Sequence, residues 1–510
     1  MVEHSEYDVA EPRAAVMIES LRAFGYDLRT ALADLIDNSI TAAAENVWID
    51  FCWNGHDSYV RVTDDGIGMS GQRLFEAMRP GSKNPLEERD AKDLGRFGLG
   101  LKTASFSQCR RLTVASKMED GDIAIRRWDL DYVAKVDKWH LLKSTAPGSE
   151  KHIGKLNELS HGTIILWECL DRIVGNSGVA DKAALSQFLQ NIRLVEEYLS
   201  MVFHRFLEGL KPQLHIYING GDESHSIRPW DPFLENHSAT IPYPNEPIPY
   251  GGGIINVKGF VLPHKDKLGD ELHKYASGPE GWNAQQGFYV YRSRRLLLPG
   301  SWLGLGSPHP WAKEEHYKLA RIRIDIPNSL DMDWQIDVKK STAKPPVAIR
   351  NRLRDLADKV RKQAREVYAH RGSYGSRPQK QPLKRAWYPV YKQGLHSYKI
   401  DRSHPLVKQA LDLDRQYRPI IEALLATLEE TVPVQQIWLD AAERPEGSSR
   451  PFEGVDKDKV GEVIRVTYRA LRIKEGLTVE AARQYLLGMD AFLDYQDIIS
   501  EVIASEEGSK

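Results

Sequence analysis

The first long segment with a clear hydrophobic period is helical. Residues 28–45 are rich in Ala, Leu and Ile and contain neither Pro nor Gly, a composition that favours a helix. Leu32, Ile36 and Ile40 recur at every fourth position, so they would lie on one side and pack against a sheet. The sequence therefore predicts an amphipathic helix over residues 28–45.

The opposite side of this helix carries a short acidic and amide stripe. Asp34, Asp37, Asn38 and Thr41 follow the spacing i, i+3, i+4 and i+7, which places them on one face. A solvated polar face is the ordinary interpretation, but the flanking Ala and Ser residues allow another group to approach closely. A carboxylate beside an amide oxygen can hold Mg²⁺ and orient a water nucleophile, so the stripe is a candidate site.

Two strands and an acidic glycine turn follow the helix. Residues 47–51 and 59–63 alternate between apolar and polar side chains, and Asn54-Gly55 between them is typical of a hairpin turn. The second strand leads directly into the run Asp64-Asp65-Gly66-Ile67-Gly68-Met69. An Asp-Gly pair alone is usually only a turn. A carboxylate at a strand end can also accept a hydrogen bond from the amine of a ring that lies on the glycine backbone.

A glycine-rich loop opens the next predicted helix. Gly95, Gly98 and Gly100 precede residues 101–105, where a helix is expected to begin. Free N–H groups and the helix dipole at such a position favour phosphate. A similar glycine spacing occurs in Rossmann turns, but no apolar strand leads into this one. Residues 79–92, which lead into this loop, are charged and contain Pro and Gly.

In this order, the three motifs resemble the ATP site of the GHKL superfamily, which includes gyrase B, heat-shock chaperones, histidine kinases and MutL. The run Gly98-Leu99-Gly100-Leu101-Lys102 further resembles the loop of MORC-like members, in which a lysine follows the last glycine. The resemblance implies ATP and Mg²⁺ as ligands, and an α+β fold that begins with a Bergerat-type α/β sandwich.

The resemblance also implies a role for each motif residue. Asp34 would orient the attacking water as general base, Asn38 would hold magnesium, and Asp64 would accept the amine of adenine. The other residues implied to contact nucleotide are Asp37, Gly66, Gly68, Met69, Lys83, Gly95, Phe97, Gly98, Leu99, Gly100 and Lys102. For Lys102 the alternative is an ordinary helix lysine that faces solvent.

Two positions depart from the family pattern. The usual base is Glu, and Asp34 is one methylene shorter, which reduces its reach by about 1.5 Å. The position of Thr41 is commonly Asp. Asp37 is therefore a second candidate for the base. We expect these departures to leave binding intact and to slow hydrolysis.

The rest of the resemblance extends to about residue 350. Residues 1–180 are expected to form the ATP-binding domain, and residues 181–346 a transducer domain with connecting helices. The strand, basic turn and strand at 287–297 resemble a strand pair of MORC-like and MutL-like transducers. His204 lies after the ATP motifs, whereas a histidine kinase needs its phosphorylated helix before them, so this class is disfavoured.

The run from Asp337 to Pro346 matches, in spacing, the MutL-type loop whose lysine reaches into the ATP site. An ammonium on a long flexible stem suits a sensor of the γ-phosphate. Lys344 is the first candidate, with a catalytic role, and Lys340 the second. The alternative is a solvated lysine loop.

Residues 347–404 are predicted to be a basic helix and a linker, and residues 405–510 a helical C-terminal domain. Basic residues outnumber acidic ones between 350 and 402, and aromatic residues lie among them, namely Tyr374, Trp387, Tyr388, Tyr391 and Tyr398. Lys and Arg for phosphates with aromatics for stacking suggest DNA. A solvated helix and a linker packed by its aromatics is the alternative.

The amino-acid composition limits the class of protein to which the chain can belong. The chain has 510 residues, 41% hydrophobic and 27% charged, with a net charge of −2, so several globular domains are expected and the whole surface is not basic. Cys52, Cys109 and Cys169 lack CxxC spacing and are interpreted as reduced thiols. Without a long apolar run or a signal peptide, we expect a cytoplasmic protein that does not engage membranes.

The motifs predict a Mg-ATP-dependent GHKL ATPase. The resemblance implies that residues 79–92 form a lid that closes on the nucleotide, and that nucleotide-dependent homodimerisation acts with this closure as a clamp or switch. The MORC-like and MutL-like features favour DNA-directed work, such as bacterial restriction or antiviral defence. Two alternatives stay open: a chaperone-like ATPase that acts on protein clients, and a nucleotide sensor that controls a partner effector protein.

Overall fold

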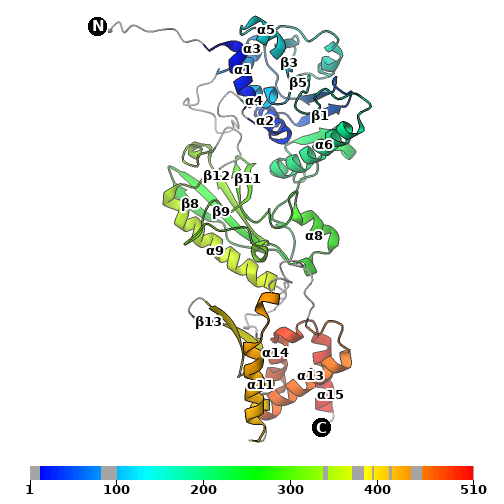
Figure 1. The fold of residues 1–510 in the computed structure, drawn as a ribbon. Helices are drawn as coiled ribbons and strands as arrows, with labels where there is room; N and C mark the ends of the chain where they lie inside the picture. Colours follow the sequence, from blue (N-terminus) through cyan, green and yellow to red (C-terminus); the bar gives the residue numbers. More distant parts are fainter. Residues whose placement is uncertain are drawn as a thin grey trace, which may run out of the picture. The chain divides into compact units, whose positions relative to one another are not determined.

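The computed structural model describes residues 12–23, 25–81, 100–336, 343–369, 384–392, 395–412, 416–437 and 451–508. The chain divides into two compact units, Met1–Gly372 and Ser373–Lys510 (Figure 1). Each unit has its own hydrophobic core. The α+β class predicted from the sequence is confirmed. The finer boundaries expected at residues 180, 346 and 404 stay predictions.

The first sheet of unit 1 is built mainly from the N-terminal part of the chain. Its strand order is β4-β3-β5-β2-β1-β6, with antiparallel neighbours except for the parallel pair β1–β6. The strands are β1 Asn46–Cys52, β2 Tyr59–Asp64, β3 Arg111–Lys117, β4 Ala124–Asp129, β5 Gly162–Glu168 and β6 His215–Ile218. The predicted hairpin of β1 and β2 is confirmed, and side chains of β1 alternate between more and less buried positions.

Helices cover this sheet and share one core with it. They are α1 Ala14–Arg22, α2 Leu28–Thr41, α3 Gly71–Met78, α4 Gly100–Phe106, α5 Leu130–Val136 and α6 Lys182–Val202, with a 3-10 segment at Glu150–Asn157. The predicted apolar positions Leu32 and Ile36 of α2 are fully buried in that core. The core therefore fixes which side of α2 faces the sheet.

Helix α2 is shorter than predicted. The sequence indicates a helix to residue 45, but α2 ends at Thr41, and Ala43 adopts a left-handed φ of 56°. The N–H of Ala44 then donates to the carbonyl of Ser39, a bond that closes the end of the helix. Ala-rich composition favours a longer helix, but the chain must turn here to enter β1.

The second sheet of unit 1 has the order β11-β10-β12-β9-β7, and β8 also pairs with β9. Its strands are β7 Ile241–Pro242, β8 Glu246–Tyr250, β9 Gly253–Val261, β10 Gly287–Arg292, β11 Arg295–Ser301 and β12 Ala320–Ile326. The predicted strand, basic turn and strand at 287–297 are therefore present as the β10–β11 hairpin.

Three helices accompany the second sheet: α7 His204–Leu207, α8 Asp270–Ser277 and α9 Val347–Ala369. Short 3-10 segments lie at Glu223–His225, Lys265–Lys267, Glu315–Tyr317 and Asn328–Leu330. Along α9, Leu353 and Val360 are buried in the core of the second sheet. The helix predicted to begin at Val347 is confirmed, and its apolar side belongs to unit 1.

Unit 2 combines a small hairpin with helices. The strands β13 Trp387–Lys392 and β14 Leu395–Ile400 pair antiparallel. The helices that follow are α10 Pro405–Leu411, α11 Arg418–Glu430, α13 Lys457–Arg469, α14 Val479–Leu487 and α15 Gln496–Gly508. A π-helical turn lies at Ala470–Lys474 and a 3-10 turn at Asp490–Phe492. The prediction of a linker up to residue 404 is therefore wrong for the part of the chain that forms the β13–β14 hairpin. Aromatic and β-branched residues in this segment favour a strand pair, and their strand propensity outweighs the linker-like composition around them.

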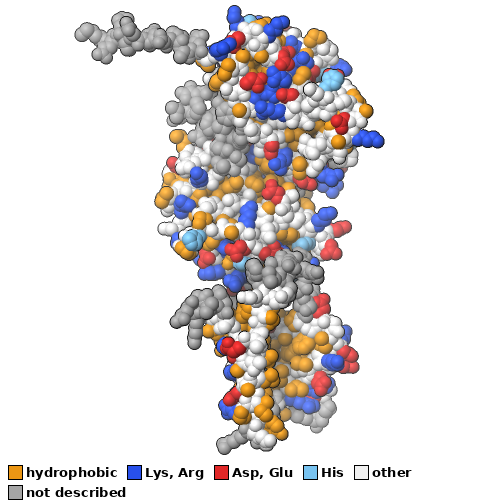
Figure 2. Space-filling view, viewed as in Figure 1, with side chains coloured by type: hydrophobic (Ala, Val, Ile, Leu, Met, Phe, Trp, Pro, Cys, Tyr) orange, Lys and Arg blue, Asp and Glu red, His pale blue; other side chains and the backbone are white. Residues whose placement is uncertain are grey.

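One side of α11 is apolar and exposed in the described part of the chain. Ile420, Leu424 and Leu428 are exposed, and Figure 2 shows hydrophobic side chains gathered over this helix. Among the residues that the structure describes, no helix is both long and apolar enough to span a bilayer.

Candidate nucleotide site

The acidic stripe on α2 lies in the interior of unit 1. Asp34 and Asp37 are 5% and 2% exposed, whereas Asn38 is exposed. Ionised carboxylates avoid burial unless they serve a partner or a ligand. The hydroxyl of Tyr26 donates to Oδ2 of Asp34 over 2.8 Å. This contact orients the Asp34 carboxylate from the segment that precedes the helix.

The start of α4 approaches Asp34 closely. A Cβ atom added to Gly100 would lie 3.4 Å from Oδ2 of Asp34, a tight contact. The glycine thus allows the backbone at the start of α4 to lie beside the carboxylate. The structure therefore brings together the last glycine of the predicted loop and the predicted base.

Asp37 is held by a residue from the second sheet. Nε of Arg295, on β11, donates to Oδ1 of Asp37 over 3.1 Å, and both side chains are 2% exposed. Burial alone would lower the pKa of Arg295, but the neighbouring Asp37, Tyr198 and Asp34 raise it. Arg295 is therefore a firmly cationic partner for Asp37.

Asp64 closes β2 and is also buried, with 5% exposure. The hydroxyl of Ser39 donates to Oδ2 over 2.9 Å, and the N–H of Gly66 donates to Oδ1 over 3.0 Å. Burial raises the pKa of Asp64 to about 6, although the hydrogen bonds from Gly66 and Ser39 act to lower it. The carboxylate is thus mostly ionised near neutral pH, and in that state it accepts hydrogen bonds.

The two glycines after Asp64 are required by close packing. A Cβ on Gly66 would lie 2.8 Å from Cβ of Ala42, at the end of α2. Gly68 has a φ of +67°, and a Cβ there would lie 1.9 Å from the carbonyl oxygen of Lys117 on β3. Met69 follows, with its N–H donating to Oγ of Ser116 over 2.8 Å and its side chain partly buried against the core. The loop is therefore fixed between α2 and β3.

Lys102 occupies a buried position on α4. Its Nζ donates to the carbonyl oxygen of Ala77, at the end of α3, over 2.9 Å, and its side chain is 2% exposed. The solvent-facing alternative for Lys102 is therefore wrong. A role at the phosphates stays a prediction. Thr41, where the family commonly has Asp, donates from its hydroxyl to the carbonyl of Asp37 over 2.9 Å within the helix.

Several predicted residues fall outside the described residues: Lys83, Gly95, Phe97, Gly98, Leu99 and Lys340. Lys344 is described, and its side chain is exposed. Its backbone N–H donates to the carbonyl of Trp334 over 2.8 Å, which fixes the end of the loop. Whether Lys344 or Lys340 senses a phosphate stays a prediction.

The donor set around α2 suits magnesium held jointly with phosphates. Within the described part of the chain, no cluster of three or more His, Cys, Asp or Glu side chains could hold a metal by itself. Mg²⁺ at phosphate sites typically takes one or two protein ligands and completes its shell with phosphate oxygens and water. The exposed amide of Asn38, one turn from Asp34, fits that requirement.

Two site residues escaped prediction from the sequence. Ser39 is adjacent to Asn38, but the spacing of the stripe did not include it. Arg295 belongs to the basic turn noted at 287–297, yet three arginines there gave no indication of which one faces α2. A pairing across 258 positions has no local signal.

Comparison with known proteins agrees with this geometry. Residues 26–163 match the family described as histidine kinase-, DNA gyrase B-, and HSP90-like ATPase. The chain is 32% identical over 94 residues to the ATPase morc-1 of Caenorhabditis elegans, which covers 18% of this chain and 10% of that protein. It is 36% identical over 99 residues to the DNA mismatch repair protein MutL of Allorhizobium ampelinum, covering 19% of this chain and 16% of that protein.

A second DNA mismatch repair protein MutL, from Thermotoga maritima, is 32% identical over 95 residues, or 18% of each chain. The matched segments thus span less than a fifth of these relatives. The family match contains α2, the end of β2 and the start of α4, where Asp34, Asn38 and Asp64 lie. Residues 26–163 therefore match an ATPase domain of the histidine kinase, DNA gyrase B and HSP90 type, and part of the chain is similar to MORC and MutL proteins.

Proposed function

We propose that this chain binds Mg-ATP between α2, the end of β2 and the start of α4, and hydrolyses it there. The observation that carries this proposal is the buried carboxylate of Asp64, which is held by Ser39 and Gly66 within the residues that match the ATPase family. No arginine or lysine pairs with Asp64 among the contacts of the described residues. A buried acid kept without a cation is costly, which favours a ligand-binding role.

The residues of α2 divide the remaining tasks. Asn38 would hold Mg²⁺, which supplies charge neutralisation at the phosphates when bound. Asp34 is the first candidate for the base, and its carboxylate accepts a hydrogen bond from the hydroxyl of Tyr26. Asp37 accepts a hydrogen bond from a guanidinium, which stabilises its anionic form and makes it a poorer proton acceptor.

We further propose that nucleotide closes the lid and promotes dimerisation, so that the protein acts as a clamp or switch in DNA-directed work, such as restriction or antiviral defence. Dimerisation is typical of this ATPase type, and two relatives are named as DNA mismatch repair proteins. Helix α9 exposes Arg350, Lys359 and Arg365, and the β13–β14 hairpin exposes Trp387 and Tyr388. These are side chains of the kinds that contact nucleic acid.

A second function is favoured by a different observation. The exposed stripe of Ile420, Leu424 and Leu428 on α11 is a surface that a partner protein could cover. In that case the ATP site would act as a nucleotide sensor that controls a partner effector. A chaperone-like role would use the same ATP site on protein clients.

Measuring ATP hydrolysis and ADP binding separately tests the proposed site. Asp34→Ala should leave ADP binding measurable and reduce hydrolysis by roughly 10²-fold or more, the usual contribution of a general base. Asn38→Ala should instead weaken binding of the magnesium complex. Asp57→Ala, which removes an exposed carboxylate in the β1–β2 turn, is the matched control. Normal hydrolysis by Asp34→Ala together with loss in Asp37→Ala would reverse the two roles.

A further inference from the structure

The ion pair of Arg295 with Asp37 joins the second sheet of unit 1 to the helix that carries the candidate ATP site. The guanidinium makes three kinds of contact. Nε donates to Asp37, Nη1 donates to the carbonyl of Leu296, and the planar group lies 5.1 Å from the ring centre of Phe203. The side chain is thus held in one orientation, aimed at α2.

The turn that presents Arg295 has an unusual backbone. Arg292 and Arg295 are paired across the hairpin, so Ser293 and Arg294 form a two-residue turn. Their φ angles are 46° and 71°, in the left-handed region that Asn and Gly normally occupy in such turns. Strain of this kind persists where surrounding contacts enforce it, and it is common at sites where a side chain must be placed.

Contacts from two sides enforce this turn. Oγ of Ser293 donates to Oδ1 of Asn328 over 3.0 Å. The guanidinium of Arg294 donates to the carbonyl of Arg205 on α7 and lies 5.5 Å from the ring centre of Phe206. The turn is therefore seated on α7, the helix that follows α6.

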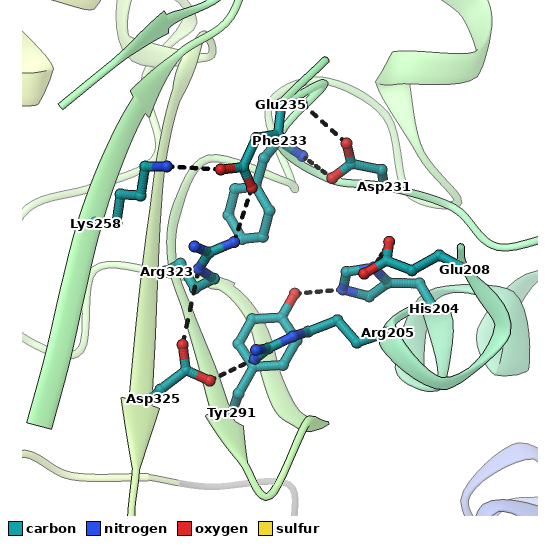
Figure 3. Close-up of polar contacts among 10 residues, drawn as sticks. All are labelled: His204, Arg205, Glu208, Asp231, Phe233, Glu235, Lys258, Tyr291, Arg323 and Asp325. Carbon is teal, nitrogen blue, oxygen red and sulfur yellow. Dashed lines mark hydrogen bonds and ion pairs between the residues drawn. The ribbon is translucent and has the colours of Figure 1, made fainter. Parts of the chain in front are cut away.

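A polar network holds α7 against the strands next to the turn (Figure 3). The buried ring of His204 shares a 2.7 Å hydrogen bond with the hydroxyl of Tyr291 on β10, and Arg205 pairs with Asp325 on β12. Arg323 links Asp325 to Glu235, so the network continues across the sheet. The contacts between α7 and the second sheet therefore determine together where Arg295 lies.

We propose that Arg295 is a positioning residue for ATP hydrolysis. Through Asp37 it fixes α2, so that Asp34 and Asn38, which lie within one turn of Asp37, keep their working positions only while the β10–β11 hairpin is seated on α7. This inference rests on the proposed ATPase function. A movement of the hairpin would take the guanidinium away from Asp37, which disfavours the buried, ionised carboxylate. The state of the second sheet is thereby coupled to turnover.

Adenine binding is expected to be independent of this contact. Asp64 is held by Ser39 and Gly66, both from the ATPase domain. Loss of Arg295 should therefore change kcat much more than nucleotide affinity. A general loss of structure would lower both.

The test compares Arg295→Gln, Arg295→Lys, Asp37→Asn and the double variant Asp37→Asn/Arg295→Gln in the full chain. For each, kcat, the KM for ATP, the Kd for ADP and the melting temperature are measured. We expect kcat to fall about 10- to 100-fold in Arg295→Gln and in Asp37→Asn, as for a small displacement of reacting groups. The Kd for ADP should stay within about threefold, because the two contacts are separate.

The conservative and double variants identify the ion pair itself. Arg295→Lys keeps the charge and should recover part of kcat, while losing the directed Nε contact. The double variant should be no slower than either single variant, because both remove the same interaction. It also removes the unpaired buried charge, so it keeps the test usable if a single variant folds poorly.

Arg292→Gln is the matched control. Arg292 lies opposite Arg295 in the same hairpin and forms a buried ion pair at 2.5 Å with Asp331, a residue outside α2. It should lower the melting temperature while kcat below the transition stays within about threefold of wild type. An equal loss of kcat in Arg292→Gln, or wild-type kcat in Arg295→Gln, would overturn the inference. Absence of hydrolysis in the wild-type protein would instead overturn the proposed function.

Discussion

Replacing Asp64 by Asn should strongly weaken nucleotide binding and at the same time stabilise the protein without ligand at neutral pH. Burial raises the pKa of Asp64 from 3.8 to about 6. Because one pKa unit corresponds to about 1.4 kcal/mol, ionised Asp64 costs the folded protein roughly 3 kcal/mol above pH 6. The amide of Asn does not ionise and avoids this cost.

The direction of the pH effect follows from the raised pKa. Protonated Asp64 favours the folded state below pH 4, and this contribution is lost as the pH rises through about 6. The Asn variant can keep the N–H of Gly66 as a donor to its oxygen, while the hydroxyl of Ser39 turns to accept from its amide. Allowing for a weaker bond to Gly66, we expect a net gain of about 1–2 kcal/mol near pH 7.5, which disappears near pH 5.

The effect on binding has the opposite sign. An amide presents a donor where the amine of adenine needs an acceptor, which costs on the order of 2–4 kcal/mol, or about 30- to 1000-fold in Kd. Calorimetric titration with Mg-ADP and thermal melting at both pH values measure the two effects, with Asp57→Asn as the exposed control. Unchanged ADP affinity in the folded variant would refute Asp64 as the adenine acceptor. A loss of stability that is larger at pH 7.5 than at pH 5 would refute the burial argument.

The remaining predictions concern the exposed lysine and the basic helix. Lys344→Ala should spare ADP binding and reduce ATP-driven closure by about 10- to 150-fold, with Lys340→Ala milder, as measured by ATPase rate and by the dimer fraction with a non-hydrolysable analogue. Wild-type behaviour of both would mean a solvated loop. Reversing the charge of Arg350 and Lys359 should weaken duplex DNA binding and flatten its salt dependence by about one unit of slope per contact, measured by fluorescence anisotropy. A slope identical to wild type would exclude Arg350 and Lys359 as phosphate contacts.

Local patterns predicted the parts of the site that are made from neighbouring residues. The apolar side of α2 and the alternating side chains of β1 and β2 could be predicted from the sequence, because each follows a single structural period. The end of α2 was not, because Ala42 and Ala43 have high helix propensity and the turn there depends on the packing of Gly66 against Ala42. The hairpin of β13 and β14 was also not predicted, because the Gly and Pro residues around it favour a linker.

The pairs that position the carboxylates could not be predicted, since each joins segments remote in sequence. The contact of Ser39 with Asp64 spans 25 positions, and that of Arg295 with Asp37 spans 258. An arginine in a basic turn is most often solvated, and only the seating of the hairpin on α7 turns Arg295 towards α2. The motifs predicted which side chains belong to the candidate site. The residues that hold those side chains in position are determined by tertiary packing.

The three acids of the site are held from three different directions, and this separates their expected effects. Tyr26 holds Asp34 from the segment before α2, Ser39 and Gly66 hold Asp64 from within the ATPase fold, and Arg295 holds Asp37 from the second sheet. We therefore expect nucleotide affinity to depend on contacts within residues 26–163. In our proposal, turnover depends in addition on the contact of Arg295 with Asp37. An ATPase arranged as proposed would keep its nucleotide bound while movement of the second sheet switches hydrolysis on or off, as the proposed clamp requires.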